Sequence, residues 1–226
     1  DDPQARTVLA FCGIFVPREI IGAYPLHWRA GRRSVLRAVN FISRPLGGFS
    51  SRVRPPTRNR PFVIVSGHGA GRWYNFFAEG HSYHGPGYRH LLIDGSAGPL
   101  HIYQCNTEHA RGQANTELRN ARHVSIYGLK GAGNYTIVWI RDSDHIRIFG
   151  YGGNAAAFEG TALFRIERTP DLLLANLVDT PRLAGAGSER HFAGRGVDPH
   201  RWHMVIEQPN DDQTIRTRPL DRPVLY

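Results

Sequence analysis

Residues 137–150 read IVWIRDSDHIRIFG, and this stretch decides the fold. It contains two short segments with alternating apolar residues, Val138/Ile140 and Ile146/Ile148, separated by a polar turn. Alternation with a period of two is typical of β-strands that bury one face. The stretch therefore predicts a strand, a tight turn and a second strand.

The same plan occurs three times along the chain. Residues 116–128 (TELRNARHVSIYG) and 163–176 (LFRIERTPDLLLAN) repeat it, at offsets of 22 and 26 residues. Helical repeats need longer periods and 3.6-residue patterning, whereas strands that stack on their equivalents one coil later fit these intervals. We predict an all-β parallel solenoid over residues 1–180, regular from about residue 88. Residues 181–226 are predicted as an irregular tail that covers the C-terminal end.

A polar residue precedes the apolar pair of several of these strands. The residues at this position are His90, His123, His145 and Asp171. Equivalent turn residues of a parallel solenoid stack about 4.8 Å apart along its axis. Such side chains hydrogen-bond along the ladder and to turn backbone groups. Metal ligation needs ligands that converge on one point, so the predicted role is structural.

Outward positions on the first strand of each copy are available for ligands. They are Glu117 and Arg119, then Trp139 and Arg141, then Arg165 and Glu167. An indole face stacks on a sugar ring, arginines bind carboxylates or hydroxyls, and a carboxyl pair acts on a glycosidic bond. The predicted roles are catalytic for Glu117 and Glu167 and substrate-binding for Arg119, Trp139 and Arg141. A solvated face with salt bridges between coils explains the same residues.

A second candidate site is the glycine-rich stretch 66–87, SGHGAGRWYNFFAEGHSYHGPG. We interpret it as a loop, because loops on a rigid solenoid are where sites normally form. It offers Glu79 as a general acid. Its predicted substrate-binding residues are Arg72, Trp73, Tyr74 and His84. The alternative is a long loop whose aromatic side chains pack back onto the solenoid.

The histidines and cysteines of the chain predict neither a metal centre nor a disulfide. His68, His81 and His84 match no specific zinc spacing, so no metal or other cofactor is expected. Cys12 and Cys105 lie in apolar contexts, where a free buried thiol is the commoner state.

The formal net charge is +9, and Lys130 is the only lysine among the basic residues. This charge points weakly to acidic ligands such as uronate polymers. The chain has no basic block with interleaved aromatics and no zinc-finger or helix-turn-helix pattern, so nucleic acid is not an expected partner. No run of about 18 apolar residues occurs, so no membrane partner is expected.

The repeated unit of turn, polar ladder residue, VxIxG strand and glycine exit resembles the pectate lyase superfamily of right-handed parallel β-helices. Within it, GRWYNFF (71–77) and IRDSDHIRIFGYGGNA (140–155) look most like bacterial proteins related to family 55 glycoside hydrolases. The resemblance covers about residues 60–180. It implies a right-handed solenoid that acts on a polysaccharide or oligosaccharide. These relatives resemble two tandem β-helices, so we expect a C-terminal portion, completed by an N-terminal half or a partner chain.

The function expected from these features is a glycoside hydrolase with a carboxyl acid/base pair drawn from Glu79, Glu117 and Glu167. One carboxyl would protonate the leaving oxygen, while the other activates water or attacks directly. A lyase on a uronate polymer is the alternative enzyme, and a non-catalytic glycan-binding or assembly solenoid is the alternative from another class. The chain begins at Asp1 without a Met. If a secretion signal has been removed, the protein acts outside the cytoplasm, which is the expected location.

Overall fold

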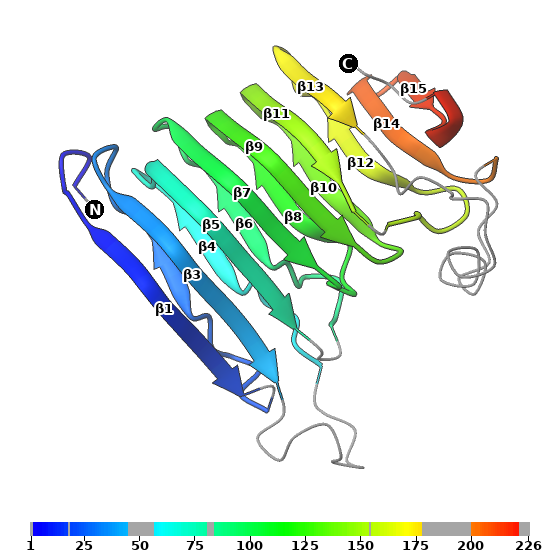
Figure 1. Cartoon of the computed structure of the whole chain (residues 1–226). Helices are drawn as coiled ribbons and strands as arrows, with labels where there is room; N and C mark the ends of the chain where they lie inside the picture. The colour runs from blue at the N-terminus through cyan, green and yellow to red at the C-terminus, as the bar shows by residue number, and fades with distance from the viewer. Residues whose placement is uncertain are drawn as a thin grey trace.

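The computed structural model describes residues 2–17, 19–44, 57–80, 84–153, 155–177 and 200–221. Two sheets face each other along the molecule, with sheet A in front of sheet B in Figure 1. Sheet A contains β1 (Val8–Pro17), β3 (Val35–Arg44), β5 (Gly71–Gly80), β7 (Leu100–Glu108), β9 (Arg122–Ala132), β11 (Asp144–Gly152) and β13 (Leu172–Leu177). Sheet B contains β2 (Leu26–Trp28), β4 (Val63–Ser66), β6 (Leu91–Asp94), β8 (Ala114–Arg119), β10 (Thr136–Arg141), β12 (Ala162–Glu167), β14 (His203–Asn210) and β15 (Gln213–Thr217).

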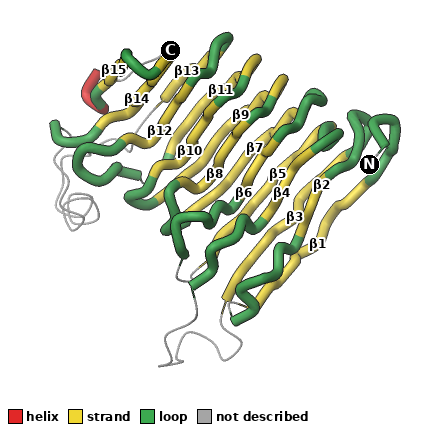
Figure 2. Tube along the Cα trace, turned by 180° about the vertical axis from the view of Figure 1, so that it is seen from behind, coloured by secondary structure: helices red, strands yellow, loops and turns green. Residues whose placement is uncertain are grey.

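The chain alternates between the two sheets, so each coil adds one strand to sheet A and one to sheet B (Figures 1 and 2). All neighbouring strands pair in parallel except β14 and β15. The crossovers are right-handed (Figure 1), which is the sense that parallel strands strongly favour. The predicted all-β, right-handed parallel β-helix is confirmed. Among the described residues, no helix is long and apolar enough to cross a membrane.

The apolar columns predicted from the repeat form the core between the sheets. Leu118, Ile140 and Ile166 are paired neighbours in sheet B, and each is at most 1% exposed. Val124 and Ile146 are paired in the same way in sheet A and are fully buried. Because equivalent residues of successive coils pack directly on one another, the period-two pattern of the sequence becomes one continuous apolar core.

The prediction that His90 shares the turn position of His123, His145 and Asp171 is wrong. Leu91 pairs with Thr116 in sheet B, so His90 lies level with Asn115 and not with the other turn histidines. His90 is fully buried, with Nδ1 2.8 Å from the Tyr88 hydroxyl and Nε2 2.6 Å from the main-chain oxygen of Glu108. His90 differs because it precedes β6, a strand of sheet B, whereas His123, His145 and Asp171 lie at or just before the start of strands of sheet A.

The other three turn residues do form a ladder. The His123 and His145 rings have centroids 4.6 Å apart. His145 Nδ1 lies 2.9 Å from Asp144, and its Nε2 lies 3.3 Å from Asp171. All three ladder residues have positive φ angles, and the carboxylates of Asp144 and Asp171 flank the His145 ring. Contacts between successive coils therefore fix this turn.

All strands of sheet A bend at the same level, each at a residue with a positive φ angle. These bend residues are Phe11, Ala38, Asn75, Gln104, Gly128, Gly150 and Asn176, with φ between 49° and 77°. Pairing continues on both sides of them, as from Tyr103↔Tyr127 to Cys105↔Leu129. The glycines that were expected to end the strands lie inside them, because a positive φ turns the strand without stopping the ladder.

The predicted irregular tail is wrong for residues 203–217. β14 continues sheet B, with Val205 paired to Phe164 and Glu207 to Ile166. β15 then pairs antiparallel with β14 and is followed by the 3₁₀ helix Pro219–Asp221. Met204 and Val205 are fully buried, which explains why this segment adds to the sheet. Residues 181–199 of that tail lie outside the described residues.

Both cysteines are free, as expected. Cys12 pairs with Val39 and Cys105 with Phe76, so two strands separate the two thiols in sheet A. Cys105 is 1% exposed, and burial raises the pKa of its thiol to about 12. It is a core side chain with no thiolate at neutral pH.

Candidate functional site

The outward residues of the first strands stack in the register expected from the sequence. Glu117, Trp139 and Arg165 form one column, and Arg119, Arg141 and Glu167 form the next. Trp139 is 9% exposed. The guanidinium carbons of Arg89, Arg141 and Arg165 lie 5.5, 4.6 and 4.4 Å from its ring centroid. The indole faces are therefore occupied by arginines of this chain.

The predicted acids of this patch are held by those arginines. Glu117 is 3% exposed and accepts hydrogen bonds from Arg89 Nε at 2.8 Å and from Arg141 Nε at 2.9 Å. Glu167 accepts bonds from Trp139 Nε1 and from Arg165 Nη2, both at 2.9 Å. Burial lowers the pKa of Arg89, and Glu117 opposes this effect. The geometry is that of a salt-bridge network between coils, which does not favour catalytic roles for Glu117 and Glu167.

Arg119 and His84, two other residues predicted to bind substrate, also make contacts within the chain. Arg119 donates to Asp94 at 2.7 Å. The His84 ring stacks on Tyr88, with centroids 3.6 Å apart, and its Nδ1 accepts a bond from the backbone N–H of Arg111. These contacts place both side chains in the framework of the coils.

The stretch interpreted as a loop is mostly a strand. Residues 71–80 form β5, and Trp73 points inward, fully buried against Trp28 and Phe76. Trp73 therefore cannot contact a substrate, because strand alternation turns it toward the core. Arg72 is exposed at the start of the strand, whereas Tyr74 and Glu79 lie on the outer face. His81 lies outside the described residues.

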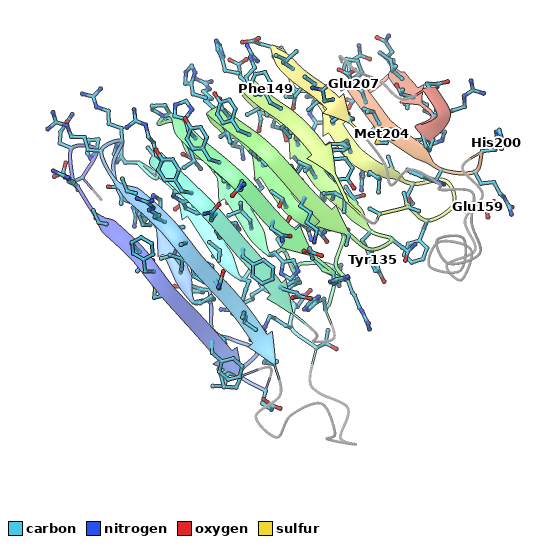
Figure 3. All side chains as sticks on the ribbon, viewed as in Figure 1. Tyr135, Phe149, Glu159, His200, Met204 and Glu207 are labelled. Carbon is cyan, nitrogen blue, oxygen red and sulfur yellow. The ribbon has the colours of Figure 1, made fainter. Side chains whose placement is uncertain are left out.

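Tyr74 is the first ring of an aromatic ladder on the outer face of sheet A. The ladder consists of Tyr74, Tyr103, Tyr127 and Phe149. Successive rings are nearly parallel, at 9°, and their centroids are 5.0, 4.9 and 5.2 Å apart. Each ring lies one residue before a bend residue, so the ladder follows the bend along the solenoid axis. Phe149 marks the end of this ladder in Figure 3.

A groove of about 740 Å³ follows the bend beside the aromatic ladder. Its polar and charged lining residues are Asn40, Asn75, Gln104, Asn106, Lys130 and Asn176, which come from β3, β5, β7, β9 and β13. Phe77 adds an aromatic side chain, and Gly128, Gly150 and Gly152 keep the C-terminal half of the groove open. A surface to which successive coils contribute in this way suits an extended ligand that lies along the axis.

Two carboxylates lie just beyond the groove, on the same outer face. Glu79 and Glu108 are paired residues of β5 and β7. Glu108 Oε1 lies 2.5 Å from Lys130 Nζ, and Glu79 Oε1 lies 3.3 Å from His109 Nδ1. Lys130 lines the groove, while His109 lines an adjoining hollow of about 370 Å³ that also includes Tyr135, labelled in Figure 3. The acid pair therefore lies between two concave surfaces.

The electrostatic setting of Glu108 keeps this carboxyl ionised. Burial raises its pKa, but hydrogen bonds from Lys130 and Asn106 and the charges of Lys130 and His109 outweigh burial, so the net pKa is lowered. The Glu108 side chain is 11% exposed and that of Glu79 is 20% exposed. Glu108 is thus held by an ammonium and Glu79 contacts an imidazole.

Glu108, His109 and Lys130 were not identified from the sequence as site residues. The local signal is the phrase NTEH (106–109), which places Glu108 level with Glu79 once the register of sheet A is known. That register depends on the bend residues, which look like strand ends in the sequence. Without it, Glu79 has no visible acidic partner.

His68 and His84, two of the three histidines considered as metal ligands in the sequence, lie at opposite ends of β5. His68 follows β4 at the start of the crossover to sheet A, whereas His84 follows β5 at its far end. Among the described residues, the ligand-like group is Asp144, His145 and Asp171 of the turn ladder. Arg147 donates to Asp171, so this group already has a cationic partner.

Comparison with family models, with curated proteins and with solved structures finds no match for this chain.

Proposed function

We propose that this protein is a glycoside hydrolase that binds an oligosaccharide along the groove of sheet A and cleaves it beside Glu79 and Glu108. The observation that carries the proposal is the pairing of these two glutamates on adjacent strands at the edge of the groove. A carboxyl pair is the chemical equipment that most glycosidases use. The neighbouring aromatic ladder provides an apolar edge beside the groove, formed by the outer rims of its stacked rings.

The environments of the two acids divide the roles between them. Glu108, ionised through its contact with Lys130, is the nucleophile that attacks the anomeric carbon. The Glu79 carboxyl, within reach of His109, donates a proton to the glycosidic oxygen as the C–O bond breaks. Water, deprotonated by Glu79, then hydrolyses the glycosyl–Glu108 ester and returns both acids to their starting states.

The spacing of the strands favours a retaining mechanism. Neighbouring strands lie about 4.8 Å apart. Carboxyl groups about 5–5.5 Å apart are typical of retaining enzymes, whereas about 6.5–9.5 Å is typical of inverting ones. Two glutamates that are direct strand neighbours fit the shorter separation, so the product is expected to keep the anomeric configuration of the substrate.

A non-catalytic glycan-binding solenoid is the second candidate, because the groove and the aromatic ladder would serve it equally well. A lyase is less favoured, since no arginine is among the described residues that line the groove. A place in the pectate lyase superfamily, and a location outside the cytoplasm, belong to the same proposal. The parallel β-helix fold supports the place in the superfamily, and a polysaccharide substrate would place the protein outside the cytoplasm.

The test compares Glu79→Gln and Glu108→Gln with Glu159→Gln as a matched control. Glu159 is an exposed glutamate that pairs with Arg201 at the C-terminal end and lies away from the groove (Figure 3). Released reducing ends are measured on a panel of neutral and acidic polysaccharides, and unsaturated uronate absorbance is followed in parallel. We expect each site variant to lose at least about 100-fold in rate, with the control unchanged. Full activity in both site variants rejects the assignment, while binding without cleavage by the parent protein selects the binding module.

A further inference from the structure

We infer that the groove of sheet A takes a neutral, linear glycan, one without carboxylate or sulfate groups, laid along the axis of the solenoid. This inference rests on the proposed function for the identity of the ligand as a carbohydrate, and it adds the substrate class. It departs from the expectation drawn from the net charge of +9, which points to acidic polymers.

Side-chain amides dominate the polar lining of the groove. They belong to Asn40, Asn75, Gln104, Asn106 and Asn176. Each amide offers a carbonyl acceptor and two N–H donors, which matches sugar hydroxyls that both donate and accept. The buried Oδ1 atom of Asn106 has no hydrogen-bond partner within the described part of the chain. An amide lining of this kind recognises hydroxyl groups and contributes no net charge.

The charge of the groove is close to zero. Among the described residues that line it, Lys130 is the only charged one, and its ammonium lies 2.5 Å from Glu108. Recognition of a uronate or sulfate favours arginine forks that bind two oxygens at once. The arginines of sheet B surround Trp139, and Arg147 is held by Asp171. No arginine is among the described residues that line this groove, although Arg37 is paired with Tyr74 at the end of the aromatic ladder.

The arrangement of the lining selects a linear ligand. The aromatic ladder repeats every 4.9–5.2 Å from β5 to β11, and an amide side chain recurs at the groove on β3, β5, β7 and β13. Successive rings cover one another's faces, so a linear chain of pyranose rings would lie along the outer edges of the ladder and place its hydroxyls against the amides. A branched or globular ligand would contact only part of the same line of residues.

The inference is tested by isothermal titration of the Glu79→Gln protein, which slows turnover, with three hexasaccharides. Cellohexaose and mannohexaose are neutral, and hexagalacturonate is acidic. Titrations at 50 and 300 mM NaCl separate them, because screening weakens binding of a polyanion and leaves a neutral ligand almost unaffected. We expect a neutral hexasaccharide to bind, with less than a twofold change between the two salt concentrations.

Three further substitutions locate the binding. Tyr103→Ala should weaken binding of the neutral hexasaccharide at least tenfold, and Asn40→Leu should weaken it several-fold. Asn40 is exposed on the outer face, so its replacement leaves the core intact if Tyr103→Ala fails to fold. Ser125→Ala, on the same face but outside the groove, is the control and should bind normally.

The possible outcomes distinguish a failure of this inference from a failure of the proposed function. Binding of hexagalacturonate alone, with affinity falling steeply in salt, overturns the neutral class and leaves a carbohydrate function standing. Binding of a neutral hexasaccharide without loss in Tyr103→Ala and Asn40→Leu overturns the groove as the site. Binding of no oligosaccharide, by this variant or by the parent protein, rejects the proposed function itself.

Discussion

Glu79 of β5 and Glu108 of β7 are direct neighbours across two parallel strands, and each contacts a different basic side chain. Lys130 contacts Glu108, while His109 contacts Glu79 at 3.3 Å. Two ionised glutamates at paired positions repel each other, and the ammonium of Lys130 offsets the charge of Glu108. The two acids therefore have chemically different partners, an ammonium for Glu108 and an imidazole for Glu79.

The contact between Lys130 and Glu108 predicts the effect of Lys130→Met. Burial raises the pKa of Glu108, and the contacts with Lys130 and Asn106 bring it below its ordinary value. Removing the ammonium leaves burial as the larger effect, so the pKa of Glu108 should rise, and the acidic limb of the activity profile should move to higher pH. A ¹³C NMR titration of the glutamate carboxyls measures the shift. Lys130→Arg keeps the charge and should keep the low pKa, and an unchanged titration in Lys130→Met would show that the contact does not set it.

The same pair links pH to stability. A carboxyl whose pKa is depressed in the folded state stabilises the fold above its unfolded-state pKa, and this contribution is lost as pH falls through the folded-state value. The parent protein should therefore be more stable than Lys130→Met at neutral pH. The difference should vanish in acid, where Glu108 is protonated in both proteins.

Glu117 predicts a large loss of stability when its charge is removed. Its two oxygens accept bonds from Arg89 and Arg141, and its side chain and that of Arg89 are both 4% exposed. Breaking a buried ion pair by removing one partner typically costs about 3–5 kcal/mol, because the remaining charge has no compensation. Urea denaturation of Glu117→Gln should show a loss of this size.

Asp94→Asn is the matched control for that measurement. Asp94 pairs with Arg119 in the same sheet, but both side chains are about one-third exposed. Water screens such a pair, and its removal should cost no more than about 1 kcal/mol. Equal losses in the two variants would mean that burial does not distinguish the pairs.

The first-strand columns could be predicted from the sequence because their geometry is local. Leu118, Ile140 and Ile166 lie the same number of residues before the second strand of their copies of the repeat. Strand alternation then determines which of their neighbours face outward. The sequence does not show how outward side chains interact across coils. That Trp139 is enclosed by three arginines depends on Arg89, which comes from the turn before the short strand β6.

The groove could not be predicted because the glycines at its bend look, in the sequence, like residues that end a strand. Gly128 and Gly150 follow an apolar strand, as a terminating glycine does, yet β9 continues to Ala132 and β11 to Gly152. A positive φ angle is compatible with either outcome. The deciding information is the pairing of each bend with its equivalents one coil away, which places Gln104, Asn75 and the glycines on one line.

Gly150 provides the test of the bend itself. Its φ angle is 77°, and a Cβ atom built there meets nothing within 4 Å. The cost of Gly150→Ala is therefore confined to the backbone, and a residue forced into the left-handed region loses about 1–2 kcal/mol. Gly150→Asn should cost less, because asparagine tolerates this conformation and Asn75 and Asn176 already occupy the equivalent positions.

Gly152→Ala separates conformation from the loss of a glycine as such. Gly152 belongs to the same strand and also has open space around its Cβ position, but its φ angle is not positive. Urea denaturation should rank the free energies of unfolding as Gly152→Ala close to the parent, Gly150→Asn below it and Gly150→Ala lowest. If Gly150→Ala and Gly152→Ala were equally stable, the positive φ angle would not be required to hold the bend, and the groove would depend on side-chain packing alone.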